Sequence, residues 1–193
     1  MLAVMDELGV EQAIVGGMSM GGPIVFEMYR QAPDRFNGMI LIDTIAAPAS
    51  PAEAGLWQGV ARQAQEMGVE SLVPFLMKNM LTGETRRENP DLTGYLGGLM
   101  TEASQEAAIA GATALANRPD STNTLGQITV PTLILVGLAD TLYPFEIAQM
   151  MQEGIPTAEL VILPGGSHAA IIEVADDANE AIMNWAQGMM QAQ

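Results

Sequence analysis

The 193-residue sequence contains no cysteine and only one histidine. The absence of cysteine excludes disulfide bonds, thiolate metal sites, iron–sulfur clusters and cysteine nucleophiles. A single histidine also leaves too few nitrogen ligands for a typical protein zinc site. The sequence therefore predicts no metal centre, and its chemistry must come from other side chains.

Basic residues and long apolar runs are also scarce. Seven Lys and Arg against 23 Asp and Glu give a net charge of −16, which repels phosphate backbones and anionic lipids. We therefore expect no nucleic-acid partner and no membrane partner. No run approaches the roughly 18 apolar residues of a membrane span, and Met1 to Val4 are followed by Asp6 and Glu7 without a basic segment. These features predict a soluble, cytoplasmic protein.

Apolar residues make up 49% of the sequence and charged residues 16%, a composition that fits one compact globular domain. Four short apolar runs are nearly continuous, which is typical of strands buried on both faces of a parallel sheet. They are residues 13–15, 39–42, 132–136 and 160–163. Helical patterns lie beside them at residues 2–8, 21–31, 145–153 and 173–190. This alternation predicts an α/β fold with helices on both faces of a mostly parallel sheet.

The stretch from residue 49 to residue 118 interrupts the alternation, because it has no convincing strand and several helix-start signals. Ser50-Pro51-Ala52-Glu53 matches a capping box with proline at the first helical position. Asn89 and Ser104 are two further predicted helix starts. We therefore expect a core formed by residues 1–48 and 119–193, with a helical insertion over residues 49–118.

A candidate nucleophile follows the first strand in Gly17-Met18-Ser19-Met20-Gly21-Gly22. A serine on a tight strand-to-helix turn is expected to need glycine two residues before and after it, because side chains there would collide with the strand and helix. Such a turn exposes the Ser19 hydroxyl and aims the Met20 backbone N–H at an oxyanion formed beside it. The alternative is that Ser19 is an ordinary helix cap.

A nucleophilic serine needs a base and an acid that orients the base. His168 follows the last predicted strand, and Asp140 follows the third. Both lie at the carboxyl edge of the predicted sheet, where open α/β sheets bind ligands. His168 taken alone is compatible with a surface or capping role, and Asp140 with capping the turn before Pro144. Asp43, at the end of the second strand, is a rival acid.

These motifs resemble those of the α/β-hydrolase superfamily, especially small cap-bearing esterases and enol-lactonases of the 3-oxoadipate enol-lactonase type. The resemblance rests on the Ser19 motif, the segments 118–121 and 130–133, the Asp140 turn with Pro144, and Gly165-Gly166-Ser167-His168. It implies an α/β-hydrolase fold and a Ser19–His168–Asp140 triad that requires no cofactor. The same motifs occur in carboxylesterases, lactonases, carbon–carbon bond hydrolases and cofactor-free haloperoxidases.

This sequence differs from the family at its N-terminus. Family members carry about four strands and two helices before the helix at residues 2–8, which is roughly 70 residues at usual element lengths. That part normally supplies a second oxyanion donor and covers the edge of the strand at residues 13–16. The sequence therefore predicts an N-terminally shortened sheet and favours a homo-oligomer formed through its uncovered edge. The alternatives are a different partner chain at this edge, a rearranged edge, or a sequence that is a fragment of a longer gene product.

The predicted function is a serine hydrolase that cleaves small carboxylic esters or lactones through an acyl-enzyme. Four apolar residues are expected to line the substrate pocket: Met18, Trp57, Leu142 and Tyr143. Activity is expected to fall at acidic pH, as His168 takes up a proton. One alternative is a truncated, catalytically weak hydrolase-like domain that serves as an interaction or oligomerisation module. Another is haloperoxidase or carbon–carbon bond hydrolase activity on the same triad.

Overall fold

The computed structural model describes residues 1–191. The chain divides into two compact units, Met1–Ala46 with Asp120–Gln193 and Ala47–Pro119. These boundaries lie within two residues of the ones expected from the sequence. We call the first unit the core unit and the second the helical unit.

The core unit contains one four-stranded sheet in the order β1-β2-β3-β4. The strands are β1 (Ala13–Met18), β2 (Phe36–Ile42), β3 (Thr132–Gly137) and β4 (Ala158–Leu163). All neighbouring strands pair in parallel, so their carboxyl ends meet at one edge of the sheet. The predicted α/β class with a parallel sheet is confirmed.

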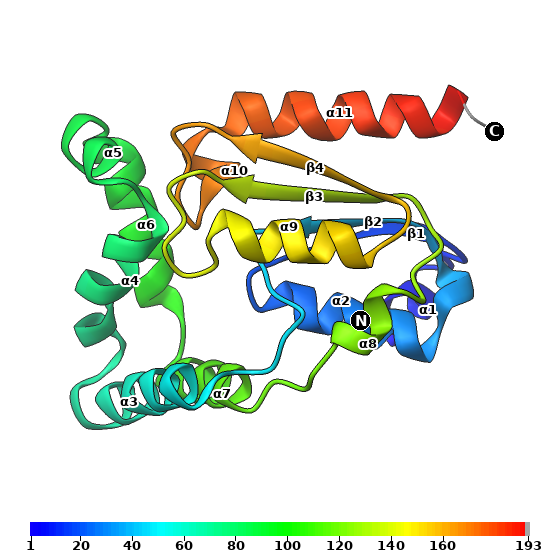
Figure 1. Cartoon of the computed structure of the whole chain (residues 1–193). Helices are drawn as coiled ribbons and strands as arrows, with labels where there is room; N and C mark the ends of the chain where they lie inside the picture. The colour runs from blue at the N-terminus through cyan, green and yellow to red at the C-terminus, as the bar shows by residue number, and fades with distance from the viewer. Residues whose placement is uncertain (192–193) are drawn as a thin grey trace. The chain divides into compact units, whose positions relative to one another are not determined.

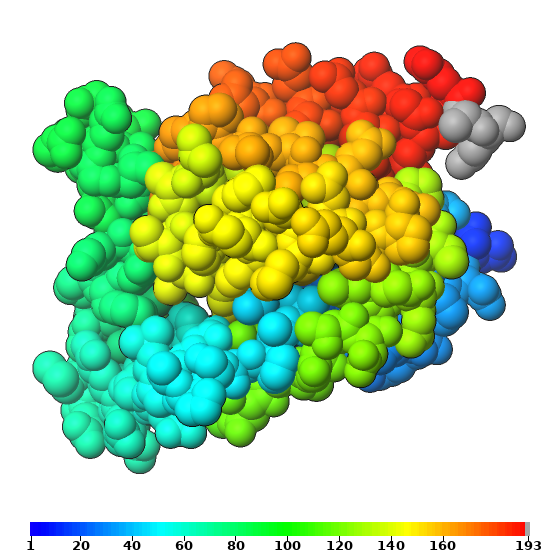
Figure 2. All heavy atoms as spheres, viewed as in Figure 1, coloured from blue at the N-terminus to red at the C-terminus, as the bar shows by residue number. Residues whose placement is uncertain are grey.

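Helices cover both faces of this sheet (Figure 1). One face carries α1 (Leu2–Glu7), α2 (Gly21–Gln31), α8 (Thr122–Leu125) and α9 (Phe145–Gly154), and the other carries α10 (Ala170–Glu173) and α11 (Ala175–Gln191). A 3₁₀ turn, η1 (Pro33–Arg35), precedes β2. In the space-filling view the atoms of α9, in yellow, lie at the surface that faces the viewer (Figure 2).

The side chains of β3 explain why its sequence is continuously apolar. Ile134 and Val136 belong to the hydrophobic core beneath α2 and α9. Leu133 and Leu135 belong to the core beneath α11. Successive residues of a strand point to opposite faces, so a sheet covered on both sides needs apolar residues at every position.

The helical unit contains helices and no strand among the described residues. They are α3 (Pro51–Met67), η2 (Val69–Leu72), α4 (Val73–Met80), α5 (Gly83–Glu88), α6 (Pro90–Glu102) and α7 (Gln105–Ala116). The three predicted helix starts are confirmed: Ser50, Asn89 and Ser104 accept hydrogen bonds from the backbone N–H three residues ahead, at 3.2, 3.0 and 3.1 Å. Thr82 caps α5 in the same way.

A buried ion pair lies inside the helical unit. The Arg118 guanidinium, with a side chain only 2% exposed, donates to Glu53 Oε1 and Oε2 at 2.5 and 2.7 Å. Its Nε also donates to the Ala47 carbonyl oxygen at 2.8 Å. Arg118 therefore joins the two ends of the unit, next to its boundaries with the core unit.

No helix within residues 1–191 is long and apolar enough to cross a membrane.

Candidate active site

Ser19 occupies a sharp turn between β1 and α2. Its φ of 51° lies in the left-handed region, and among residues 1–191 only Asp43, at 42°, shares this feature outside glycine. The Ser19 N–H donates to the Ile42 carbonyl oxygen of β2 at 2.9 Å. A left-handed conformation costs a non-glycine residue about 1–3 kcal/mol and persists only where the surroundings impose it.

The glycines around Ser19 differ in their importance. A Cβ atom on Gly17 would lie 2.4 Å from the Gly21 carbonyl oxygen, and one on Gly22 would lie 2.0 Å from Thr44 Oγ1. A Cβ atom on Gly21 would meet nothing within 4 Å. The expectation that the glycine two residues after the serine prevents a collision is therefore wrong. The collision arises one residue later, at Gly22, where the Thr44 side chain, from the segment after β2, lies against α2.

Ser19, His168 and Asp140 form one chain of hydrogen bonds. His168 Nε2 lies 2.8 Å from Ser19 Oγ, and His168 Nδ1 lies 2.8 Å from Asp140 Oδ2. A carboxylate only accepts hydrogen bonds, so Nδ1 carries the imidazole proton and Nε2 accepts from the Ser19 hydroxyl. The three residues come from the loops after β1, β3 and β4, which meet at one edge of the sheet.

The two oxygens of Asp140 have separate partners. Oδ1 accepts hydrogen bonds from the backbone N–H groups of Leu142 and Tyr143, at 2.8 and 3.1 Å. Oδ2 is the atom that contacts His168. Asp140 thus caps the turn before Pro144 and contacts the imidazole at the same time. The two interpretations considered from the sequence describe different oxygens of one carboxylate.

Three of the predicted pocket residues lie in the core unit. The Tyr143 ring packs edge-on against the His168 ring, with centroids 5.5 Å apart. Leu142 is half-buried. Met18 is partly buried and packs against the hydrophobic core beneath α11. Their contact with a substrate remains a prediction.

The fourth predicted pocket residue, Trp57, belongs to the helical unit. It is buried in a hydrophobic cluster with Val60, Ala64 and Ala116. Its indole Nε1 donates to Glu53 Oε1 at 3.3 Å. These contacts account for Trp57 as a core residue of its own unit, and its role in substrate binding also remains a prediction.

Asp43, the rival acid, is buried at the end of β2 and contacts neither ring nitrogen of His168 among the hydrogen bonds of the described residues. Its Oδ1 accepts from the Gly137 N–H at 2.7 Å and its Oδ2 from the Ala170 N–H at 3.3 Å. Burial is the main cause that raises its pKa from 3.8 to about 7, and the negative charge of Asp140 adds to this increase. Hydrogen bonds from Gly137 and Ala170 and the charge of His168 act in the opposite direction.

Sequence reasoning missed Thr44, whose hydroxyl donates to the Ser19 carbonyl oxygen at 2.5 Å. A signal was available, because Asp43-Thr44 is a polar pair directly after an apolar strand. Such a pair falls at the same sheet edge as the nucleophile, the acid and the base.

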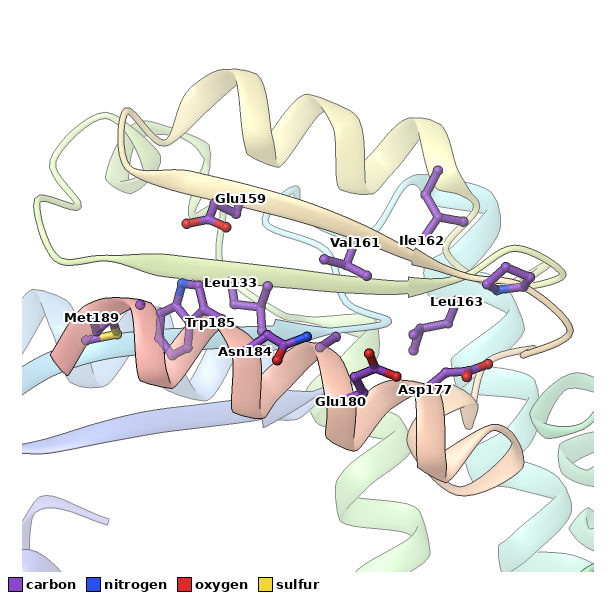
Figure 3. A pocket seen from close by; sticks show the side chains of 13 residues that line it. Leu133, Glu159, Val161, Ile162, Leu163, Asp177, Glu180, Asn184, Trp185 and Met189 are labelled. Carbon is purple, nitrogen blue, oxygen red and sulfur yellow. The ribbon is translucent and has the colours of Figure 1, made fainter. Parts of the chain in front are cut away.

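Two further observations concern possible ligand sites. Within residues 1–191, no three His, Asp or Glu side chains are grouped so that they could hold a metal ion. A groove of about 490 Å³ lies between β4 and α11, and its walls include Val161, Trp185 and the acidic Glu180 (Figure 3). The residues that line this groove include none of the predicted site residues.

Comparison with known proteins places this chain in a family. The profile of the α/β hydrolase fold family matches residues 1–175. The AB hydrolase superfamily protein YisY of Bacillus subtilis is 32% identical over 185 residues, covering 93% of this chain and 68% of YisY. The 3-oxoadipate enol-lactonase 2 of Acinetobacter baylyi is 27% identical, covering 94% of this chain and 66% of the enol-lactonase.

Solved structures agree with the sequence comparison. A thermophilic esterase from Thermogutta terrifontis superimposes with a TM-score of 0.91 and 30% identity, over 96% of this chain and 69% of the esterase. The present chain spans about two thirds of the length of these relatives. The family match, the identity to YisY and the superposition together show that this chain belongs to the α/β hydrolase fold family.

Proposed function

We propose that the protein is a serine hydrolase that cleaves small carboxylic esters or lactones. The observation that carries the proposal is the unbroken chain of hydrogen bonds from Ser19 Oγ through His168 to Asp140, each 2.8 Å long. The names of its relatives, an esterase and enol-lactonases among them, support the same class of reaction.

The arrangement suits acylation of Ser19. Ser19 Oγ attacks the carbonyl carbon while its proton passes to His168 Nε2, and the carbonyl oxygen becomes an oxyanion. His168 then returns the proton to the departing alkoxide as the carbon–oxygen bond breaks. Asp140 keeps the imidazole in the required tautomer and stabilises its positive charge. The products of this half-reaction are an alcohol and an acylated Ser19; a lactone gives one ring-opened chain with both groups.

In deacylation, water is the nucleophile and Ser19 is the leaving group. His168 Nε2 takes a proton from the water that attacks the acyl carbon, and it returns this proton to Ser19 Oγ as the carboxylic acid leaves. One ester and one water thus give one alcohol and one acid. No redox change and no cofactor enter the reaction.

The oxyanion has a candidate donor in the Met20 backbone N–H. Met20 is the N-cap residue of α2, so the partial positive charge of the helix N-terminus adds to its effect. Among residues 1–191 this N–H has no hydrogen-bond acceptor in the protein. Loss of one such donor typically lowers the rate by about 10²–10³-fold.

The test is Ser19→Ala assayed with p-nitrophenyl acetate, a small lactone and a fluorophosphonate label. We expect hydrolysis to fall by about 10⁴-fold or more and labelling to disappear. Ser104→Ala removes an exposed helix cap by the same substitution and should keep full activity. Retained turnover in Ser19→Ala would refute the proposal, and an inactive, unlabelled wild type would favour a non-catalytic interaction module instead.

A further inference from the structure

Asp43 and Thr44, at the end of β2, connect the three loops that carry Ser19, Asp140 and His168. Thr44 Oγ1 donates to the Ser19 carbonyl oxygen at 2.5 Å. Asp43 Oδ1 accepts from Gly137, three residues before Asp140, and Oδ2 accepts from Ala170, two residues after His168. One carboxylate therefore contacts both the loop of the acid and the loop of the base.

Backbone hydrogen bonds also hold the Asp43 and Ser19 segments against the neighbouring strands. The Asp43 N–H donates to the Leu135 carbonyl oxygen, and the Ser19 N–H donates to the Ile42 carbonyl oxygen, both at 2.9 Å. Asp43 and Ser19 are also the two non-glycine residues with positive φ within residues 1–191. Strained conformations of this kind cluster at functional sites, where the surrounding contacts impose them.

Burying an aspartate at this position costs free energy, and a purely structural link would not require a charged side chain. Asp43 is 1% exposed, and a buried carboxylate is stabilised only by its hydrogen bonds and by opposite charges. The charged groups that act on it are Asp140, which disfavours its ionised form, and His168, which favours it when protonated. Since His168 becomes an imidazolium during turnover, an ionised Asp43 stabilises the charge that develops there.

We propose that Asp43 is a positioning residue of the hydrolase: its carboxylate aligns the acid and base loops and adds a second negative charge that favours the His168 imidazolium. This proposal rests on the function proposed above. It assigns Asp43 no contact with the substrate. Asp140 remains the acid that contacts the imidazole, and Asp43 acts through the loops and through its charge.

The test is Asp43→Asn. Asparagine has nearly the same shape and tolerates a left-handed backbone, and it retains one acceptor oxygen for Gly137. Asp34→Asn, which removes one negative charge from an exposed position, is the matched control. Both variants are compared with wild type in p-nitrophenyl acetate hydrolysis and in the rate of fluorophosphonate labelling, from pH 5.5 to pH 8.5.

At pH 8.5, where Asp43 is ionised, we expect Asp43→Asn to lower kcat/KM and the labelling rate by about 10- to 100-fold, the range typical of residues that orient a directly acting side chain. The loss should appear in kcat, with KM nearly unchanged. At pH 5.5, where Asp43 carries a proton because its pKa is about 7, the ratio of wild type to variant should approach one. Asp34→Asn should match wild type throughout.

The contrary outcomes are distinct. Equal activity of wild type and Asp43→Asn at pH 8.5, or a loss that is the same at every pH, would overturn the role of the charge. A wild type that is neither active nor labelled would instead refute the serine hydrolase function itself. A variant with lower activity and a lower unfolding midpoint at pH 8.5 would indicate a merely structural role.

Discussion

Burial of an ionised Asp43 should make the folded protein less stable at alkaline pH. The pKa of Asp43 is about 7 in the fold and 3.8 in its ordinary state, so the folded state binds a proton more tightly than the unfolded state. Between pH 4 and pH 7 the folded state holds this proton while the unfolded state releases it. Stability therefore decreases as the pH rises through this window and is lowest above pH 7.

The magnitude follows from the same two values. Each pKa unit corresponds to 1.36 kcal/mol, so the ionised carboxylate costs about 4 kcal/mol above pH 7. Asp43→Asn removes this cost and also loses the hydrogen bond from Ala170, which is worth about 1 kcal/mol. We expect the variant to be more stable than wild type by about 3 kcal/mol at pH 8.5, and less stable by about 1 kcal/mol at pH 4.

The assay is urea unfolding followed by tryptophan fluorescence. Trp185 lies in the core unit and Trp57 in the helical unit, so a Trp57→Phe background leaves Trp185 as the reporter of the core unit. Wild type and Asp43→Asn are compared in this background at pH 4, 5.5, 7 and 8.5. A variant that is less stable than wild type by the same amount at every pH would refute the reasoning, because it would show that Asp43 is not a destabilising buried charge.

Three further predictions concern packing, charge and assembly. Gly17→Ala should destabilise the core unit by about 1–3 kcal/mol and lower the proposed hydrolysis of p-nitrophenyl acetate, because the new Cβ would lie 2.4 Å from a carbonyl oxygen, whereas Gly21→Ala should be tolerated. Glu53→Ala should destabilise the helical unit by about 3 kcal/mol in urea unfolding, because it removes the carboxylate that pairs with the buried Arg118 guanidinium. The edge strand β1 exposes Ile14, which is 43% accessible; we expect a dimer through this edge in light scattering and a monomer for Ile14→Lys.

Each of these predictions has a contrary result. Equal stability and activity of the two glycine variants would show that the turn adapts to a side chain at position 17. For the ion pair, Glu88→Ala is the control, since its contact with Arg87 is exposed and 3.9 Å long and should contribute less than about 1 kcal/mol; equal losses in both variants would contradict the argument. A wild-type monomer would contradict the role of the β1 edge.

Much of the fold could be predicted because its signals are local. A strand covered on both faces must be apolar at every position, so β3 was visible as the run Thr132-Leu133-Ile134-Leu135-Val136. Serine and asparagine caps marked the starts of α3, α6 and α7 because their side chains bond to backbone N–H groups only three residues away. The start of α5 at Thr82 went unpredicted, although it uses the same device.

The site was less predictable where it depends on contacts between distant segments. Strand order placed the loops of Ser19, Asp140 and His168 at one edge, because parallel strands end together. The two oxygens of Asp140 have different partners, and Asp43 accepts a hydrogen bond from Gly137. Both features depend on loop conformations, which cannot be predicted from the spacing of residues in the sequence. The need for glycine at position 22 likewise arises from Thr44, which belongs to a different strand end.

The most direct test of the central claim is to label the folded protein with a fluorophosphonate and map the adduct by peptide mass spectrometry. A Ser19 hydroxyl activated by His168 predicts a single adduct on the peptide that contains Ser19, and no adduct in a folded His168→Ala variant. An adduct on any of the other serines, or undiminished labelling of Ser19 without the imidazole, would contradict the account.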